Sequence, residues 1–292
     1  MVRKILRWLG YILLAILALL LIGAAWIWFA SSREIGRIHS ARPETLAPPT
    51  PAQLGDAVRQ ARLLGCFSCH GEGLRGRLMF KESGVAEVWA PNLTEVAARA
   101  DDQQLARAIR QGIGADGRAL WVMPSPMYSR LSDGEVAALI AVIRRLPRAG
   151  EATPPVSLGP LGRFGIATGR FRPATAMTDE FRVRQPYQVG REHEAGRRLA
   201  SINCSECHGP DLGGGRPGPD AAAPGLSIAG AYDLAHFRTL MRTGRPPDGR
   251  DLGLMRTVAR QDFSHLTDEE IAQLHGYLQA RAERVQDPPV EP

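Results

Sequence analysis

The chain has 292 residues, of which 44% are hydrophobic and 23% charged, and it carries a formal net charge of +6. This length is enough for a membrane anchor and two compact domains of ordinary size. Three of the positive charges, Arg3, Lys4 and Arg7, precede an apolar N-terminal run, and the other charges are of mixed sign along the chain. We therefore expect no nucleic-acid partner.

The apolar run from Trp8 to Ala30 contains no charged residue. As a helix it is about 35 Å long, against a hydrocarbon core of about 30 Å. Residues 1–32 are therefore predicted to form a single-pass anchor in the cytoplasmic membrane. The basic flank before the run places the N-terminus in the cytoplasm and the rest of the chain on the periplasmic, outer face. The alternative is a cleaved signal peptide, cut after Ala25, whose apolar region would be unusually long.

Residues 33–54 contain Pro43, Pro48, Pro49 and Pro51. Proline removes a backbone donor and disfavours regular structure in the residue before it. The segment is therefore predicted to be an extended, proline-rich tether between the anchor and the first domain.

The first domain is predicted over residues 55–147, and it contains the pentapeptide Cys66–His70. Apolar spacing indicates helices at about 56–64 and 101–110. A further helix is expected to begin at Ser132, since Ser132 and Glu135 form the pattern S-x-x-E of a capping box.

A linker is predicted over residues 148–189. Its stretch 158–171 is too apolar for a flexible spacer. We expect it to pack on a domain or to cover the edge of a bound group, or else to be an ordinary ordered linker.

The second domain is predicted over residues 190–284, with the pentapeptide Cys204–His208. Helices are expected at about 192–202 and 233–241, and from the capping box that begins at Thr267. Residues 285–292 are predicted to be a disordered tail.

Both pentapeptides read C-x-x-C-H, the attachment signature of c-type haem, and together they use all four cysteines. Two thiols one helical turn apart can add to the vinyl groups of one porphyrin, and the adjacent imidazole then lies over the ring and ligates the iron. A zinc site would need pairs about 15–20 residues apart, whereas these lie 138 apart. A redox dithiol would need a βαβ context, which is not seen. We expect two covalently bound haem c groups, held by Cys66, Cys69 and His70 and by Cys204, Cys207 and His208.

An internal repeat extends beyond the pentapeptides. Residues 110–123 align without a gap on residues 242–255, at a constant offset of 132, and seven of the fourteen positions are identical. The segments Leu131–Asp133 and Leu266–Asp268 also correspond. The chain is therefore predicted to contain two related domains in tandem, whose length differences fall in loops.

With these motifs, both halves resemble class I cytochrome c domains. The segment Met123–Asp133 is similar to the ending found in cytochrome subunits of membrane-bound alcohol and sugar dehydrogenases. The resemblance implies an all-α fold, with one N-terminal transmembrane helix followed by two tandem class I cytochrome c domains. It implies that a methionine of this segment is the distal iron ligand. It also implies that the carbonyls of Pro91 and Pro224 orient the two histidines by accepting their other ring N–H.

The internal repeat indicates which methionine of this segment is the distal ligand. Met123 corresponds to Met255, whereas Met127 has no methionine at the same offset. Met123 and Met255 are therefore the predicted distal ligands, with ordinary packing as the alternative. Iron held by His and Met has no vacant position for a substrate, so we expect electron transfer without substrate chemistry and no catalytic residue.

The function that follows is single-electron transfer between a respiratory or dehydrogenase donor and a downstream carrier or terminal oxidase. Expected partners are a dehydrogenase, a quinol-oxidising complex, an oxidase or a small soluble cytochrome at the membrane. The alternatives are an enzyme resembling dihaem cytochrome c peroxidase, which requires one high-spin haem, and a haem-based sensor or adhesion module.

Overall fold

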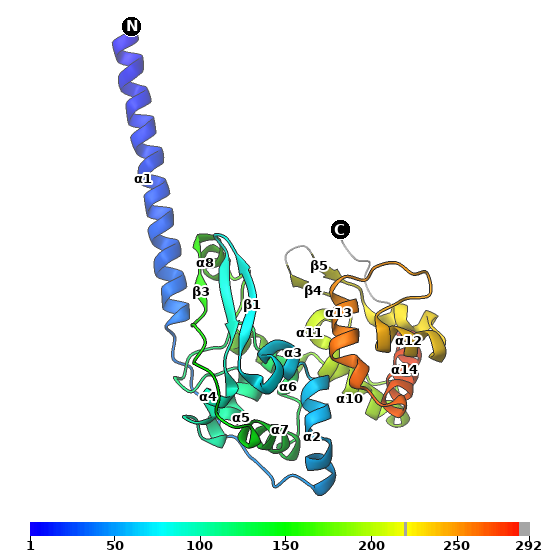
Figure 1. Ribbon diagram of the computed structural model, residues 1–292. Coiled ribbons are helices and arrows are strands. Elements are labelled where there is room, and N and C mark those ends of the chain that lie inside the picture. Colours follow the sequence, from blue (N-terminus) through cyan, green and yellow to red (C-terminus); the bar gives the residue numbers. More distant parts are fainter. Residues whose placement is uncertain (219–220, 286–292) are drawn as a thin grey trace.

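The computed structural model describes residues 1–218 and 221–285. Helix α1, Val2–Ile35, projects from the rest of the molecule (Figure 1). It is the one helix in the described residues that is long and apolar enough to cross a membrane, and its side chains are almost all exposed. The helix is therefore a candidate membrane anchor.

The part that follows α1 contains six α-helices and one 3-10 helix before residue 148. They are α2 Pro51–Leu63, α3 Cys66–His70, η1 Glu72–Leu74, α4 Leu93–Ala97, α5 Asp102–Gln111, α6 Ser125–Tyr128 and α7 Asp133–Arg145. Their apolar faces meet in one core, around Leu105, Tyr128, Val136 and Ile140. The helices expected near residues 56–64 and 101–110 are found with small shifts of their ends.

The C-terminal half repeats this plan around a second core that includes Phe237, Ile271 and Tyr277. Its helices are η2 Arg191–His193, α10 Glu194–Asn203, α11 Ser205–His208, η3 Leu226–Ala231, α12 Leu234–Thr243, α13 Leu254–Gln261, η4 Phe263–His265 and α14 Asp268–Ala282. Both predicted capping boxes are present: Ser132 accepts from the Glu135 amide and Thr267 from the Glu270 amide, and each glutamate bonds back. Helices dominate both halves, as the all-α prediction requires.

The repeated residues of the two halves have matching structural roles. Arg110 binds the Leu131 carbonyl and the carboxylate of Asp133, at the start of α7. Arg242 makes the same two kinds of bond to Ser264 and Asp268 before α14.

The repeated glycines and the Asp-Gly-Arg triplets also have matching roles. Gly112 and Gly244 end their helices in the left-handed conformation, where glycine has no steric penalty. In each Asp-Gly-Arg turn, the aspartate carboxylate accepts from the arginine amide, at Asp116 and at Asp248. These structural roles explain why most of the identical positions of the repeat are kept. They do not explain the methionine at its end, Met123 in one half and Met255 in the other.

Small sheets, which no alternating pattern predicts, supplement the helices. The strands β1 Arg77–Glu82, β2 Ala86–Ala90 and β3 Ser157–Leu158 form an antiparallel sheet in that order. A second pair joins β4 Gly215–Gly218 to β5 Ala221–Ala223. Most side chains of β1 are exposed, so the strand lacks the two-face burial that makes a strand visible in sequence.

The segment predicted as an extended tether, residues 33–54, is shorter than expected and is bonded to the first half. Helix α1 continues to Ile35 and α2 already begins at Pro51. Between them the chain lies against the first half: Gln111 binds both the amide and the carbonyl of Arg42, and Arg110 pairs with Glu44 at 2.8 Å. The prolines prevent a helix here, and the side chains of α5 satisfy the backbone groups that remain.

The linker between the halves is ordered. Besides β3 it contains α8, Pro160–Ala167, which packs on α1, and α9, Ala174–Val183, which packs on α6. Phe181 of α9 enters the first core. The apolar stretch 158–171 is therefore a packed element, in which α8 lies on α1 and β3 joins the sheet of the first half. Of the predicted disordered tail, residues 286–292 lie outside the described residues.

Candidate haem-binding sites

The first pentapeptide forms α3, directly after Gly65 in the left-handed conformation. Nδ1 of His70 lies 2.8 Å from the carbonyl oxygen of Pro91, and the imidazole is buried. A carbonyl can only accept, so Nδ1 carries the proton and Nε2 carries the lone pair. Burial raises the pKa of the Cys66 thiol to about 12 and that of Cys69 to about 11. These thiols are protonated at neutral pH, unlike those of a redox dithiol.

The second pentapeptide has the same arrangement. Cys204 is the N-cap of α11, and Nδ1 of His208 lies 2.7 Å from the carbonyl oxygen of Pro224. Burial raises the pKa of both Cys204 and Cys207 to about 12. The structure therefore brings each predicted histidine to its predicted proline carbonyl. Because the proton is on Nδ1 in both rings, both have the tautomer in which Nε2 can ligate iron.

Asn92 is a neighbour of the first site that sequence reasoning missed. It is buried, caps α4 through its side-chain oxygen, and donates from Nδ2 to the carbonyls of Ala149 and Glu151. These bonds hold the backbone next to Pro91, and thus the carbonyl that His70 uses. The only local sign of this role in the sequence is the preference of asparagine for the N-cap position of a helix.

Each pentapeptide is followed by a glycine whose backbone only glycine tolerates. Gly71 has φ 78° and ψ 166°, and Gly209 has φ 82° and ψ 158°. This region is essentially closed to other residues. A Cβ on Gly209 would lie 2.5 Å from the carbonyl oxygen of Gly214, whereas one on Gly71 would lie 3.4 Å from that of Gly76.

We expect Gly209→Ala to harm the protein more than Gly71→Ala. Both variants strain the backbone by roughly 1–3 kcal/mol, but only Gly209→Ala adds a collision with the backbone. Denaturant unfolding of the two purified variants, with the covalent haem content of each, measures this difference. Equal losses in both variants would show that the collision contributes nothing.

The predicted distal methionines lie beside the same cores as the cysteines. Met123 and Cys66 both pack, partly buried, against the first core. Met255 packs against the second core, of which Cys204 is a member. Met127 is buried, and its sulfur accepts the backbone N–H of Glu206 at 3.1 Å. The competing methionine therefore already has a partner in the other half.

Each pentapeptide lies at the contact between the halves and meets residues of the other half. Met127, four residues after Met123, contacts Glu206 of the second pentapeptide. Asp262, seven residues after Met255, faces Ser68 of the first pentapeptide and Gly65 just before it, with Oδ2 3.6 Å from the place of a Cβ on Gly65. In the register of Leu131–Asp133 with Leu266–Asp268, Met127 and Asp262 correspond. The contact is thus reciprocal, as in an isologous dimer.

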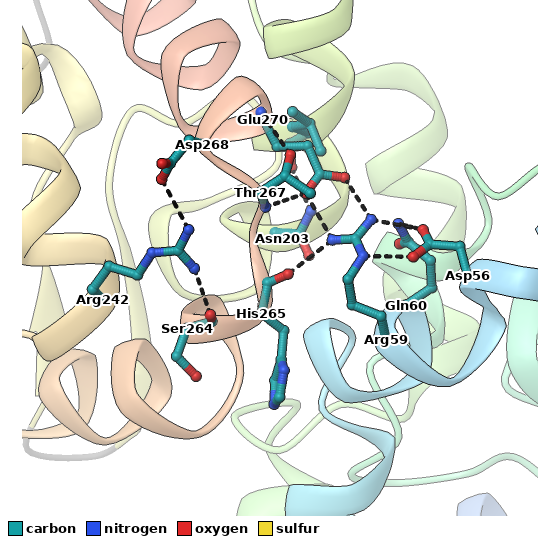
Figure 2. Close-up of polar contacts among 11 residues, drawn as sticks. Asp56, Arg59, Gln60, Asn203, Arg242, Ser264, His265, Thr267, Asp268 and Glu270 are labelled. Atoms are coloured by element: carbon teal, nitrogen blue, oxygen red, sulfur yellow. Dashed lines mark hydrogen bonds and ion pairs between the residues drawn. The ribbon is translucent and has the colours of Figure 1, made fainter.

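Ion pairs repeat this reciprocity. Arg59 of α2 binds Glu270, the capping-box residue of α14, at 2.8 and 3.0 Å, and it also binds the His265 carbonyl and Asp56 (Figure 2). In the other direction, Arg198 of α10 binds Glu135, the capping-box residue of α7, at 2.5 Å.

Each half also contributes an apolar side chain to the core of the other half. Leu63 of α2 belongs to the second core, and Ile202 of α10 belongs to the first. The two halves are therefore joined by buried apolar contacts together with the ion pairs, and sequence reasoning gave no sign of this.

Two carboxyl groups lie at this contact. Burial raises the pKa of Glu206 to about 7, and the nearby Asp262 adds to the effect. Burial likewise raises the pKa of Asp262 to about 6, against a smaller opposing effect of the Ser68 hydroxyl. Burial also lowers the pKa of Arg130 to about 10; its guanidinium binds the Ser201 carbonyl at 2.8 Å beside them. Two acidic groups with raised pKa values therefore lie near each other where the halves meet.

The residues present fit covalent haem. Each site offers two protonated thiols on one turn and an imidazole held with Nδ1 protonated, with a methionine beside the same core. Within residues 1–218 and 221–285, no three Cys, His, Asp or Glu side chains are grouped as ligands of a metal ion. Small helical domains with this thiol and imidazole arrangement define the class of c-type cytochromes.

Comparison with known families gives the more particular assignment. Residues 193–282 match the family described as cytochrome c, and residues 51–143 match that described as cytochrome C oxidase, cbb3-type, subunit III. The chain therefore contains two cytochrome c domains in tandem behind a candidate membrane anchor. It is an electron-transfer haem protein whose domains carry covalent haem c. No curated protein matches the chain.

Proposed function

We propose that this protein is a membrane-anchored dihaem cytochrome, with domains at 55–147 and 190–284, that passes single electrons from one haem to the other. The observation that carries the proposal is that both pentapeptides lie where the two halves meet: Glu206 of the second contacts Met127, and Ser68 of the first lies beside Asp262. Bound haem supplies the one-electron couple. The ligand sets are Cys66, Cys69, His70 and Met123, and Cys204, Cys207, His208 and Met255.

The surrounding residues fix and shield the two sites. The Pro91 and Pro224 carbonyls orient the histidines, and the hydrogen bond that each Nδ1–H donates makes the imidazole a stronger ligand. Met127, Tyr128 and Ile202 are buried in the first core near the contact between the halves. Closely packed surroundings rearrange little when the iron changes its charge, which favours rapid electron transfer.

We further propose that both domains lie on the periplasmic face. There the protein would take electrons from a dehydrogenase or a quinol-oxidising complex and deliver them to a carrier or a terminal oxidase. The match of residues 51–143 to a subunit family of cbb3-type oxidase supports an oxidase on the acceptor side. A stable place as a subunit of such a complex is part of this proposal.

The test is purification from membranes with whatever co-purifies, followed by a spectrum during redox titration. We expect two covalent haems per chain, both low-spin, with the charge-transfer absorption of Met-ligated ferric iron. A native high-spin haem that binds carbon monoxide, together with peroxide turnover, would instead show the peroxidase alternative.

A further inference from the structure

Helix α8, in the linker between the halves, packs against the C-terminal end of the candidate membrane helix (Figure 1). The guanidinium of Arg163 lies over the Trp28 ring at 3.9 Å and donates to the hydroxyls of Ser31 and Ser32, both at 3.0 Å. Ser31 is completely buried. The position of α8 along α1 is therefore fixed at Trp28–Ser32.

This position corresponds to the surface of a bilayer. The uncharged run of α1 ends at Ala30, and Trp28 belongs to its last turn. Tryptophan at the end of a span lies at the level of the lipid headgroups. The neighbouring Trp26 and Phe29 remain 54% and 70% exposed, so lipid reaches α1 at this level. An element packed on Trp28 therefore lies in the interfacial layer itself.

Helix α8 exposes apolar side chains at the same level. Leu161 is 62% exposed and Phe164 is 39% exposed. They are three residues apart, so they share one side of the helix. Arg163, between them, is directed to α1 instead. Helix α8 thus directs the charged side chain of Arg163 to α1, while the apolar side chains of Leu161 and Phe164 are exposed. In water, the opposite arrangement would be favoured, because burial of apolar groups and exposure of charge lower the free energy.

The tip of the β1–β2 hairpin holds α8 rigidly. The amides of Gly159 and Leu161 donate to the carbonyls of Val85 and Gly84, at 2.9 and 2.8 Å. A Cβ on Gly159 or on Gly162 would collide with these same carbonyl oxygens. The exposed apolar side chains therefore belong to a fixed element of the first domain.

We propose that Leu161 and Phe164 insert into the interfacial layer of the bilayer that α1 spans, and so form a second membrane contact. The occupant is lipid, because the surface is continuous with the lipid-exposed side of α1 at the same depth. This inference rests on the proposed membrane anchorage. Two contacts fix the tilt of the first domain relative to the bilayer plane, and thereby which faces of the two domains lie away from the membrane to meet a partner.

The test uses the full haem-loaded chain in vesicles of zwitterionic lipid, and again with anionic lipid added. Leu161→Cys introduces a thiol for a nitroxide spin label, because the native cysteines are held in haem links. Collision with oxygen, which concentrates in lipid, is compared with collision with a water-soluble nickel chelate. Val58→Cys on α2, exposed and remote from α8, is the matched control, and Leu20→Cys in α1 is the reference for depth.

We expect the ratio of oxygen collisions to nickel collisions to be several-fold higher for the label at 161 than for the label at 58, in both lipids. Phe164→Glu should reduce that ratio at 161. Equal nickel access at 161 and 58, with lipid protection at 20, would overturn the second contact and leave the anchor intact. Nickel access at 20 as well would overturn the anchorage itself. Protection of 161 that appears only with other membrane proteins present would show that a protein covers α8, which also contradicts the proposal.

Discussion

Replacement of Met123 by leucine should convert the first haem from six-coordinate, low-spin iron to five-coordinate iron that binds carbon monoxide. Leucine keeps the packing volume beside the first core but has no sulfur to donate. Thioether ligation raises the reduction potential, and axial ligands tune haem iron over a range of about 0.8 V. The first potential should therefore fall by a sizeable part of that range. Magnetic circular dichroism and a redox titration measure both effects.

Met127→Leu is the matched control, only four residues away. Its sulfur accepts the Glu206 amide, so its loss should weaken the contact between the halves and leave both haems low-spin. The reverse pattern, with a high-spin haem in Met127→Leu and none in Met123→Leu, would assign the ligand to Met127. Met255→Leu should reproduce the Met123 result at the second haem.

Replacement of Arg59 by alanine should loosen the contact between the two halves. Arg59 is partly buried and binds Glu270, Asp56 and the His265 carbonyl together, so its removal leaves these acceptors without their shared donor. Charged hydrogen bonds of this kind are each worth about 1.5–3 kcal/mol, and we expect a loss on the order of 2 kcal/mol after relaxation. Denaturant unfolding and the rate of transfer between the haems, after rapid reduction of one of them, measure the change.

Arg198→Ala is the control on the other side of the reciprocal contact. Its pair with Glu135 is more exposed, and exposed pairs contribute about 0–1 kcal/mol. A larger effect of Arg198→Ala than of Arg59→Ala would contradict this ranking.

The contribution of the Arg59 pair should also depend on pH. Burial opposes ionisation of Glu270, but the bonds from Arg59 and from the Thr267 amide outweigh it, and its pKa is lowered. A carboxyl group whose pKa is lowered on folding stabilises the folded state at a pH above its pKa in the unfolded chain. This stabilisation is lost as the pH falls through the pKa in the folded protein. The difference between wild type and Arg59→Ala should therefore shrink in acid.

The features that sequence reasoning predicted are local. Ser132 and Thr267 show their capping boxes because each bond joins residues three positions apart. The pentapeptides are visible because their chemistry requires one helical turn. The carbonyls of Pro91 and Pro224 came from family resemblance, since nothing local connects Pro91 with His70.

The features that it missed depend on the meeting of distant segments. Strand β1 has no clear alternation because both of its faces are largely exposed. The contact of Met127 with Glu206 joins residues 79 positions apart, and methionine carries no local sign of such a role. Likewise, Arg163 is one arginine among many until α8 is seen on Trp28.

The reciprocal contact between the halves also bears on the origin of the chain. A single ancestral domain with both halves of this contact would bind a second copy of itself, and the ancestor would thus have been a homodimer. Gene duplication and fusion make that encounter independent of concentration. They also free the two copies to differ at the centre of the contact. Met127 on one side and Asp262 on the other are such a difference, since a thioether occupies one side of the contact and a carboxyl group the other.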